Sequence, residues 1–434
     1  STRSKPAQGS AIVIFNGEEH NAGKEIKTTE DKKPTVIIEL NNQVMENIID
    51  ETIRDNNTGA GSVIQIPITD TSSQVAKVEL TGDIVKKLAE SSVDTLIKWN
   101  NLEYIVPAEE FTSAIIAENL GVPEKDLQDI KFEIKISKID ETVVAHYNEV
   151  AKAHGAELIF PPVEFEIAAK TIKSDDTTRE IKISKFSNYV ERVMEIPAGI
   201  DPSKITTGIV FNSDGSYNHV PTQVYQKDGK WYAKLNSLTN SPYSVIWNQI
   251  MVSSVENHWS KETVNDMASR LVIFNPETFD PNKAITRADF AEYIVRALGL
   301  YREGYNYKNK FTDVSSTGER TLAILIAHEY GIVTGYPDGA FRPDREIIRE
   351  EAMVMYQRAM EITKLSGSDQ DRYLNYTDSA EVSSWAESYV KEVLSAQVFN
   401  GTTATTILPK SNLTYAEAAQ AIKNLLVKSG LINQ

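Results

Sequence analysis

The sequence contains no cysteine, which excludes disulfide bonds, thiolate metal sites and a cysteine nucleophile. It also lacks long hydrophobic runs: no stretch reaches the roughly 18 apolar residues that a membrane-spanning helix requires. Ser1–Lys5 do not show the charged-then-apolar pattern of a secretion signal. We therefore expect no membrane span, and we expect either that a leader has been removed or that the chain is a fragment.

The sequence has fewer positively charged than negatively charged residues. The chain has 45 Lys and Arg residues against 61 Asp and Glu residues, a formal net charge of −16. Such a charge opposes broad electrostatic contact with nucleic acid or with an anionic membrane surface. We therefore expect no nucleic-acid partner, and an anionic ligand would have to be held by local hydrogen-bond donors.

Motifs for catalysis and metal binding are also absent. The six histidines show no metal-ligand spacing, and the sequence has neither a Gly-x-Ser-x-Gly turn nor a phosphate-binding loop. We therefore expect no metal, no cofactor and no enzyme activity. Paired carboxylates that hydrolyse glycosides stay an open alternative, because 61 acidic residues make chance pairs abundant and only geometry decides between them.

The composition that remains is that of a folded protein of several domains: 434 residues, 41% hydrophobic and 24% charged. The hydrophobic pattern changes along the chain. It predicts an α+β multidomain protein with a lead-in segment, an N-terminal α+β domain, a β-sandwich-like module and a C-terminal all-α region, at residues 1–33, 34–160, 161–250 and 251–434.

The upstream elements follow from local signals. We predict a helix over 141–153 and tight hairpin turns at Asn100-Asn101, Asp214-Gly215 and Asp228-Gly229, whose residues tolerate positive φ. The last predicted hairpin, from Trp231 to Trp247, interleaves aromatic and polar residues. We interpret those aromatic side chains as one face of a half-buried sheet rather than as a platform for carbohydrate.

One pattern occurs three times after residue 250. A short run at a predicted helix start, which we call the anchor run, appears at Ile285–Asp289, Ile347–Glu351 and Leu413–Glu417, spaced by 62 residues (285 to 347) and 66 residues (347 to 413). Such spacing indicates a repeated unit that buries its apolar face against its copies. We place the repeats at about 251–307, 308–372 and 373–434.

Each repeat has a helix and then a turn before its anchor run. Trp259 opens a predicted helix to Ile273 in repeat one, Trp385 opens the corresponding helix in repeat three, and Glu319 stands at the same position in repeat two. The turn is clearest in repeat two, in the run Gly335-Tyr336-Pro337-Asp338-Gly339, where the proline presets φ and the last glycine tolerates positive φ.

The anchor runs also suggest a binding chemistry. Thr286 is a good N-cap, so Arg287 falls in a first helical turn, where free N–H groups and the helix dipole favour an anion such as a carboxylate. Arg349 repeats this arrangement, although Ile348 replaces the capping threonine, which we expect to cost about 1 kcal/mol. In repeat three Tyr415 replaces the arginine.

With these motifs in order and in matching spacing, the last 184 residues resemble three tandem surface-layer homology repeats, a family that anchors bacterial exoproteins to the cell wall. The resemblance implies a pseudo-threefold bundle whose inter-repeat grooves bind secondary cell-wall polysaccharide, often through a pyruvate ketal. It also implies an extracellular location at the cell wall or surface layer, with other surface-layer subunits as possible partners. The ligand-binding candidates are Thr286, Arg287, Arg349, Trp259, Trp385, Gly335, Tyr336, Asp338 and Gly339.

Two functions follow from the resemblance. The chain is either a non-catalytic anchor of a surface-layer protein or exported enzyme, or a piece of a glycan-acting enzyme that carries its own anchor. We favour the anchor. Release of reducing ends from polysaccharide by residues 1–247 would separate the two.

Overall fold

The computed structural model describes residues 7–54, 62–172 and 178–434. The chain forms two compact units that interleave along the sequence. Unit 1 comprises residues 1–148, 160–200 and 225–244, and unit 2 comprises residues 149–159, 201–224 and 245–434. Within the described ranges, no helix is both long and apolar enough to cross a membrane.

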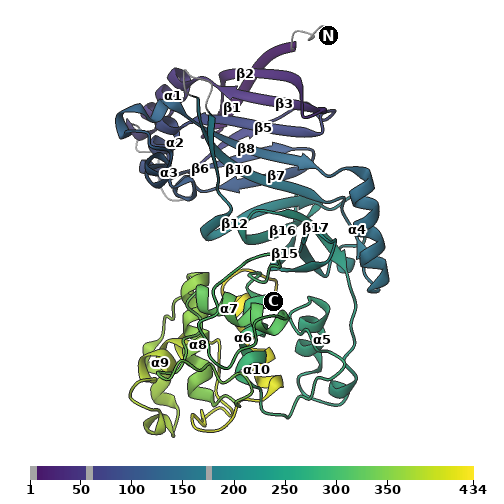
Figure 1. The fold of residues 1–434 in the computed structure, drawn as a ribbon, viewed down its shortest axis with the longest axis vertical. Helices are drawn as coiled ribbons and strands as arrows, with labels where there is room; N and C mark the ends of the chain where they lie inside the picture. The colour runs from purple at the N-terminus through teal and green to yellow at the C-terminus, as the bar shows by residue number, and fades with distance from the viewer. Residues whose placement is uncertain (1–6, 55–61, 173–177) are drawn as a thin grey trace. The chain divides into compact units, whose positions relative to one another are not determined.

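Unit 1 is built on a large, mostly antiparallel sheet (Figure 1). One series of paired strands runs β2–β3–β5–β8–β10–β11, and β1 joins it to a second series, β4–β6–β7–β12–β16. Only β3–β5 and β4–β6 are parallel among these pairs. The bounds are β1 Ala7–Phe15, β2 Glu18–Glu30, β3 Lys33–Leu40, β4 Ser62–Pro67, β5 Val75–Thr81, β6 Val93–Trp99, β7 Leu102–Val106, β8 Ile130–Lys138, β10 Val163–Ile172, β11 Thr178–Lys182, β12 Lys185–Glu195 and β16 Lys230–Thr239.

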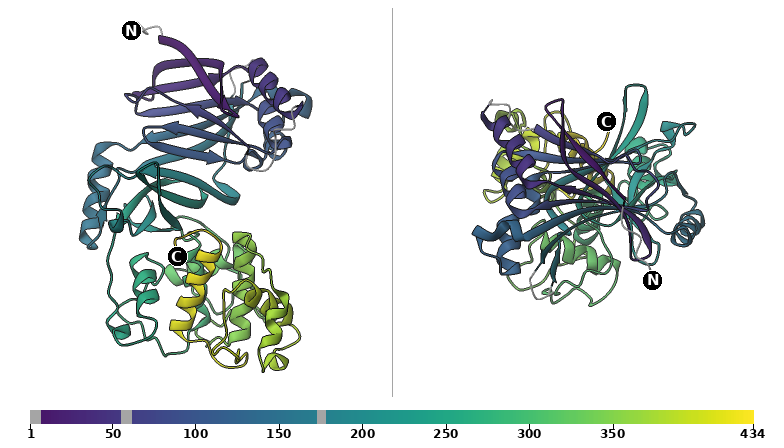
Figure 2. Two further views of the ribbon diagram at one scale, coloured as in Figure 1. Left: turned by 180° about the vertical axis from the view of Figure 1, so that it is seen from behind. Right: turned by 90° about the horizontal axis from the view of Figure 1, so that it is seen from above.

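Helices α1 (Asn42–Arg54), α2 (Gly82–Glu90) and α3 (Ser113–Leu120) gather on one side of this sheet (Figures 1 and 2). Helix α2 buries Ile84, Val85 and Leu88 where it contacts β5, β6 and β8. Its apolar residues recur at helical spacing, which is why this short segment folds as a helix against the sheet. The sequence did not indicate α3, whereas helix α4 (Glu141–Ala153) has the bounds that were predicted.

The turn predictions are confirmed at two of three places. Asn100 and Asn101 take φ of 49° and 61° between β6 and β7, and Asp228 and Gly229 take 52° and 78° between β15 (Thr222–Lys227) and β16. At the third turn only Gly215 has a positive φ. Asp214 instead accepts hydrogen bonds from Ser216, which holds a longer loop between β13 (Thr207–Phe211) and β14 (Tyr217–Val220).

The N-terminal segment differs from its prediction as a lead-in with one short strand. Residues 7–30 form the β1–β2 hairpin, and residues Gly23 to Glu30 of β2 pair with β3. Short-range patterns hid β2, because almost all of its residues are polar and only Ala22 is buried. Strands of 34–160 and 161–250 also share this sheet, through β8–β10 and β7–β12. Their division into two domains stays a prediction about independent folding.

The core of unit 1 contains a buried cation, Arg192. Its guanidinium carbon lies 4.8 Å from the ring centre of Tyr243 and 5.2 Å from that of Tyr104. The nitrogens donate to the carbonyl oxygens of Val190 (2.6 Å) and Thr239 (2.7 Å). Carbonyl dipoles and aromatic faces therefore stabilise this charge, which is 0% exposed.

Unit 2 carries the repeats as short helices. Each repeat has a first helix and a second helix that starts at the anchor run; in chain order these are α5 Lys261–Ser269, α6 Arg287–Ala297, α7 Glu319–Glu329, α8 Arg349–Thr363, α9 Glu387–Ser395 and α10 Tyr415–Lys428. Helix α5 is shorter than the predicted span from Trp259 to Ile273. It ends because Leu271 takes a φ of 68°, which turns the chain out of the helix.

The three anchor runs hydrogen-bond to one another in a closed ring. Ile285 N donates to Leu413 O (2.9 Å), Leu413 N to Ile347 O (3.0 Å) and Ile347 N to Ile285 O (3.1 Å). All three of these side chains are buried. The start of each second helix is thereby held against the other two, and this junction is what places the candidate site residues.

The helix starts differ as their sequences predict. The Thr414 hydroxyl accepts from Glu417 N, and the Glu417 carboxylate accepts from Thr414 N, a complete capping box. At α6 the Thr286 hydroxyl likewise accepts from Asp289 N. The Asp289 carboxylate does not complete a capping box but accepts from the Tyr415 hydroxyl. Ile348 has the same extended backbone and no capping side chain.

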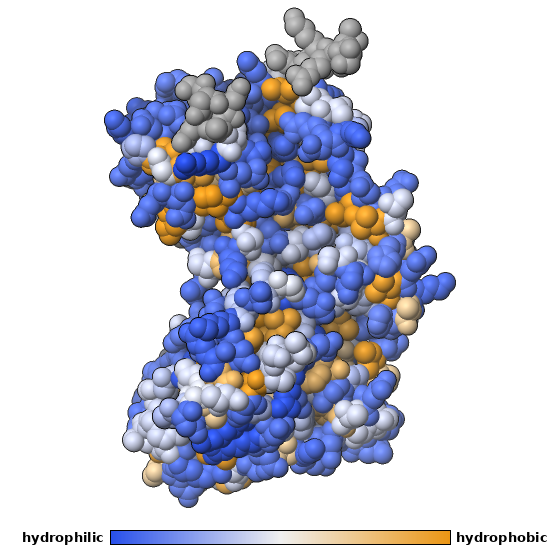
Figure 3. Space-filling view, viewed as in Figure 1, coloured by the Kyte–Doolittle hydropathy of each residue, from blue (hydrophilic) through white to orange (hydrophobic). Residues whose placement is uncertain are grey.

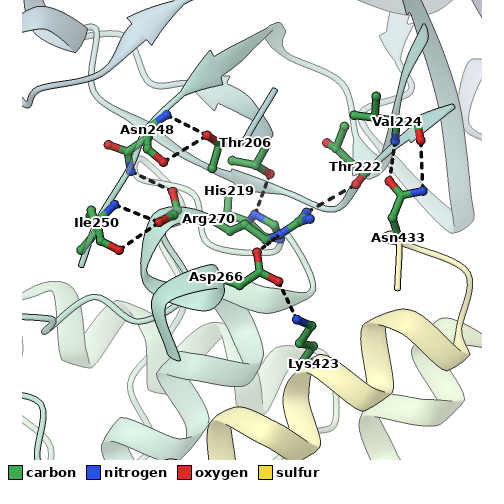
Figure 4. A network of polar contacts seen from close by, with 12 residues as sticks. Thr206, His219, Thr222, Val224, Asn248, Ile250, Asp266, Arg270, Lys423 and Asn433 are labelled. Atoms are coloured by element: carbon green, nitrogen blue, oxygen red, sulfur yellow. Dashed lines mark hydrogen bonds and ion pairs between the residues drawn. The ribbon is translucent and has the colours of Figure 1, made fainter. Parts of the chain in front are cut away.

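The strands of unit 2 pack on its helical repeats through polar side chains (Figure 4). Arg270, at the end of α5, forms an ion pair with Asp266 (2.8 Å) and donates to Thr222 O (3.5 Å), and Asp266 also pairs with Lys423 of α10 (3.0 Å). Asn433 exchanges two hydrogen bonds with the backbone of Val224. Residues 201–224 are therefore part of the same packed unit as the repeats.

Candidate functional site

The first two N–H groups of helices α6 and α8 are not free for an anion, which contradicts that premise of the sequence analysis. Arg287 N donates to Arg345 O (2.9 Å) and Ala288 N to Pro343 O (3.0 Å). In the next repeat, Arg349 N donates to Ser411 O (2.9 Å) and Glu350 N to Pro409 O. The carbonyl groups of the following repeat use these donors, because the ring of anchor runs brings that chain segment over each helix start.

The anchor arginines are buried among partners. The Arg287 side chain is 9% exposed, and its Nε donates to Phe341 O at 2.9 Å. Its guanidinium carbon lies 4.8 Å from the ring centre of Tyr336, and Nη1 lies 3.8 Å from a Glu351 oxygen. Burial lowers the pKa of Arg287, although the Tyr336 and Glu351 groups oppose that change. The side chain thus fastens repeat one to the turn of repeat two.

A groove of about 660 Å³, which we call groove A, opens beside that turn. All three repeats contribute to it: Arg287 from the first, Tyr336 and Arg358 from the second, and Trp385 from the third. Its other lining residues are Val333, Thr334, Gly335, Pro337, Arg345, Ile348, Glu350, Glu351, Val354, Met355, Ser383 and Tyr389. Groove A therefore joins an aromatic face to several guanidinium groups.

Glu350 lines groove A and is 1% exposed. It accepts from the backbone N–H and hydroxyl of Ser383 (2.9 and 2.7 Å) and from Lys410 (2.8 Å). Burial alone would raise the pKa of this carboxyl, but the hydrogen bonds from Lys410 and Ser383 outweigh burial and lower it. Glu350 is therefore ionised, and its hydrogen bonds to Ser383 and Lys410 connect repeat two to repeat three.

A second groove, groove B, has a volume of about 520 Å³ and the same kind of origin. Arg349 comes from repeat two, the turn and helix α10 come from repeat three, and Trp259 comes from repeat one. Arg349 forms an ion pair with Glu417 and donates to Asn412 O (2.9 Å). The remaining lining residues are His258, Asn282, Val398, Phe399, Asn400, Gly401, Thr402, Thr414, Gln420, Ala421 and Asn424.

The two tryptophans at the grooves are exposed rather than packed in the core. Trp259 is 64% exposed and Trp385 is 55% exposed, although each stands just before a helix of its repeat. On the face drawn in Figure 3, hydrophilic residues cover most of unit 2. A large apolar ring held at the edge of a polar groove is suited to packing on the apolar face of a sugar.

The third equivalent position is built differently. Tyr415 stands where Arg287 and Arg349 stand in the other repeats, and its hydroxyl donates to Asp289. Its ring packs edge-on against Phe279, with centroids 5.8 Å apart. The corresponding cavity lies beside the turn of repeat one, at Phe274 and Pro276, and has a volume of about 300 Å³. Glu319 lines it where a tryptophan lines grooves A and B, and Ser216, Tyr217 and Asn218 line it as well. It therefore lacks both the exposed indole and the anchor guanidinium.

The structure distributes the predicted site residues in two sets. Arg287, Gly335, Tyr336 and Trp385 meet in groove A, and Arg349 and Trp259 meet in groove B. The others shape the chain, since Thr286 caps α6, Gly339 takes a φ of 85°, and Asp338 accepts from Ala340 N and Arg342 within the turn; none of these three lines either groove.

Sequence reasoning missed several groove residues, among them Arg345, Arg358, Tyr389, Gln420 and Asn424. Arg358 lies nine residues after Arg349, and Asn424 lies nine residues after Tyr415, the corresponding residue of the next anchor run. That common spacing was a signal that could have found them, because nine residues make two and a half helical turns and so bring both side chains to equivalent places on the helix.

Comparison with known proteins bears on this helical region. The family model described as the S-layer homology domain matches residues 253–291, 310–353 and 375–419. These segments contain the three anchor runs. The matched segments contain most of the groove-lining residues, but not Val354, Met355 and Arg358 of groove A or Gln420, Ala421 and Asn424 of groove B.

Relatives match the same part of the chain. An amylopullulanase of Thermoanaerobacterium thermosulfurigenes is 29% identical over 56% of this chain and 13% of its own length. A cellulosome-anchoring protein of Acetivibrio thermocellus is 29% identical over 32% of this chain and 30% of its own. A surface layer protein of Brevibacillus choshinensis is 38% identical over 19% of this chain and 8% of its own.

The chain spans less than a third of the length of each of these relatives, and the three carry different names. The amylopullulanase match extends over 245 residues, which is longer than the repeated helical region. The order of the motifs, the ring of anchor runs and the family match agree: residues 253–419 are three tandem S-layer homology domains.

Proposed function

We propose that this chain anchors a surface-layer protein or an exported enzyme to the bacterial cell wall, by binding secondary cell-wall polysaccharide in grooves A and B. The observation that carries the proposal is that each groove combines an exposed tryptophan with the anchor arginine of another repeat. A ligand in either groove would touch all three repeats.

The closed ring of hydrogen bonds among the anchor runs supports a pseudo-threefold arrangement of the repeats. In such a bundle, grooves A and B are equivalent positions, and the cavity at Glu319 is the third. We propose that this third position does not bind the polymer, because it lacks the indole and the anchor guanidinium.

The relatives support a location at the cell surface, because two of them are named a surface layer protein and a cellulosome-anchoring protein. We propose that the anchoring region is non-catalytic. The amylopullulanase match keeps the second candidate, a glycan-acting enzyme that carries this anchor, because the shared region could serve either kind of protein.

Sedimentation with purified cell walls tests the proposal. The chain should pellet with walls that carry their polysaccharide and stay in solution with walls from which the polysaccharide has been extracted. We further propose a pyruvate ketal as the ligand's acidic group, so mild-acid removal of pyruvate should weaken binding. Equal sedimentation with extracted and intact walls would contradict the proposed function.

A further inference from the structure

Grooves A and B occupy equivalent places but differ in charge. We infer that groove A holds an acidic group of the glycan through Arg345 and Arg358, whereas groove B takes an uncharged polar part of it through amide side chains. This inference rests on the proposed function and deepens it, since it assigns a different ligand chemistry to each groove.

Groove A has an excess of positive charge. Its lining includes Arg287, Arg345 and Arg358 against the carboxylates Glu350 and Glu351. Glu350 already has Lys410 as its partner at 2.8 Å, so it neutralises little of the groove's own charge. A carboxylate entering groove A would meet more guanidinium than the groove's carboxylates can balance.

The two arginines that can reach a ligand are not the anchor arginine. Arg287 already donates to Phe341 O beside the turn of repeat two, and its side chain is only 9% exposed. The Arg345 side chain is 47% exposed; its Nη1 donates to the Tyr336 hydroxyl at 2.9 Å, and its Nη2 lies 3.8 Å from a Glu351 oxygen. These contacts leave further N–H groups of Arg345 for an acidic ligand.

Arg358 lies on α8 and lines the same groove. Among the described residues no carboxylate forms an ion pair with it, and its hydrogen bond to Ile332 O is long, at 3.4 Å. A guanidinium with five N–H donors and one weak protein contact is suited to a bidentate bond with a carboxylate.

Groove B has neutral side chains at the positions that carry these charges in groove A. Asn424 stands in α10 where Arg358 stands in α8, and it donates to Val398 O (3.0 Å) as Arg358 does to Ile332 O. Ser411 stands four residues before Tyr415, as Arg345 stands before Arg349, but it does not line groove B. The remaining ionic pair of the lining, Arg349 with Glu417, balances its own charge.

Apart from the Arg349–Glu417 pair, the polar side chains of groove B are amides, one imidazole and two hydroxyls. Gln420 donates to Asn424 (3.0 Å), and its oxygen accepts from Thr263 (2.7 Å), so the amides are fixed in orientation. Fixed amides beside an exposed Trp259 ring offer both donors and acceptors but no net charge. That chemistry is suited to sugar hydroxyl and acetamido groups.

The test separates the grooves by removing one tryptophan at a time. The probes are purified wall polysaccharide, intact or stripped of pyruvate, and titration calorimetry gives the affinity. With Trp259→Ala, groove A remains, and stripping should lower affinity at least about tenfold, as should 0.5 M salt. With Trp385→Ala, groove B remains, and both changes should alter affinity less than about twofold.

Equivalent residues provide the matched variants. Added to Trp259→Ala, Arg358→Asn should lower affinity for intact polymer about tenfold and leave that for stripped polymer unchanged. Added to Trp385→Ala, Asn424→Arg should create a preference for intact polymer. Circular dichroism confirms that each variant is folded.

The outcomes distinguish the two levels of the argument. If the unchanged chain binds neither polymer, the proposed function itself fails. If the unchanged chain binds, then equal sensitivity of both single-groove variants to stripping overturns the assignment of charge. A Trp385→Ala chain that binds neither polymer overturns the assignment of groove B, and equal losses for both polymers in Arg358→Asn overturn the role of that arginine.

Discussion

At the scale of single residues, the anchor arginines hold the fold while the groove edge remains exposed. Arg287→Ala would leave Phe341 O without its donor and Glu351 with one cation fewer, inside a buried junction. We expect unfolding free energy to fall by about 2–3 kcal/mol. Arg345→Ala, at an exposed position, should change it by less than about 0.5 kcal/mol. Urea unfolding measures both, and equal losses would contradict the burial argument.

The tryptophans are expected to behave in the opposite way. Trp259 and Trp385 are more than half exposed, so replacing either by alanine should change the unfolding free energy by less than about 1 kcal/mol. If they stack on sugar rings, each replacement should weaken polymer binding roughly tenfold. Calorimetric titration of folded variants measures this, with Trp231→Ala in unit 1 as a matched control. Unchanged binding in both groove variants would remove the stacking role.

Glu350 gives the repeats a dependence on pH. Its pKa is lowered in the folded chain, so its stabilisation is fully present above the ordinary carboxyl pKa of about 4.3 and is lost as pH falls through the folded value. Glu350→Gln should therefore destabilise unit 2 at pH 7 by about 1–3 kcal/mol, because Lys410 and Ser383 lose a charged acceptor. The difference from the unchanged chain should shrink below pH 4. Thermal unfolding across pH 3–7 checks this, and a constant difference would contradict it.

At the scale of elements, the second helices of the three repeats begin with the same backbone conformation, two of them with a capping side chain and one without. Thr414→Ala removes the hydroxyl that accepts from Glu417 N, keeps the backbone N–H that donates to the Glu417 carboxylate, and should cost about 1 kcal/mol. Ile348 has φ −84° and ψ 159°, nearly the same backbone as Thr286 and Thr414, but no capping side chain. Ile348→Thr should therefore stabilise α8 by about 0.5–1 kcal/mol, as measured by urea unfolding. A loss would mean that the half-buried isoleucine contributes more through packing.

The helices show how element signals succeed and fail. Amphipathic spacing and caps correctly predicted the second helix of each repeat, because these signals lie within a few residues of one another. The predicted end of α5 lies too far along the chain, because Leu271 ends the helix with a positive φ and no glycine marks that position in the sequence. Strand β2 was missed because its pairing with β1 and β3, rather than its own pattern, makes it a strand.

At the scale of the whole molecule, the grooves and the packing that supports them extend over different parts of the sequence. Both grooves are lined only by residues after 250, so a fragment of residues 251–434 should still bind wall polymer. That fragment loses the contacts of Arg270 with Thr222, of Ser269 with Asn248, and of Asn433 with Val224. We expect its repeats to unfold at a lower temperature than those of the full chain. Scanning calorimetry with wall sedimentation tests both parts, and a folded fragment that does not sediment would contradict the first.

The sequence by itself determined the repeats, their helix starts and the family they belong to. It also placed the tryptophans and anchor arginines in register, because all of these are local patterns that recur at a fixed spacing. Composition excluded disulfide bonds and thiolate chemistry outright, since a residue type that is absent cannot act in any fold.

Only the tertiary structure decided what those residues can reach. The ring of anchor runs brings carbonyl groups of one repeat onto the N–H groups of another, which removes the anion site that the helix starts suggested. The same ring assembles each groove from three repeats, so Arg345 and Arg358 become neighbours of Trp385 across more than 25 residues of chain. Contacts between distant segments depend on packing free energy summed over the whole unit, and no local pattern encodes that sum.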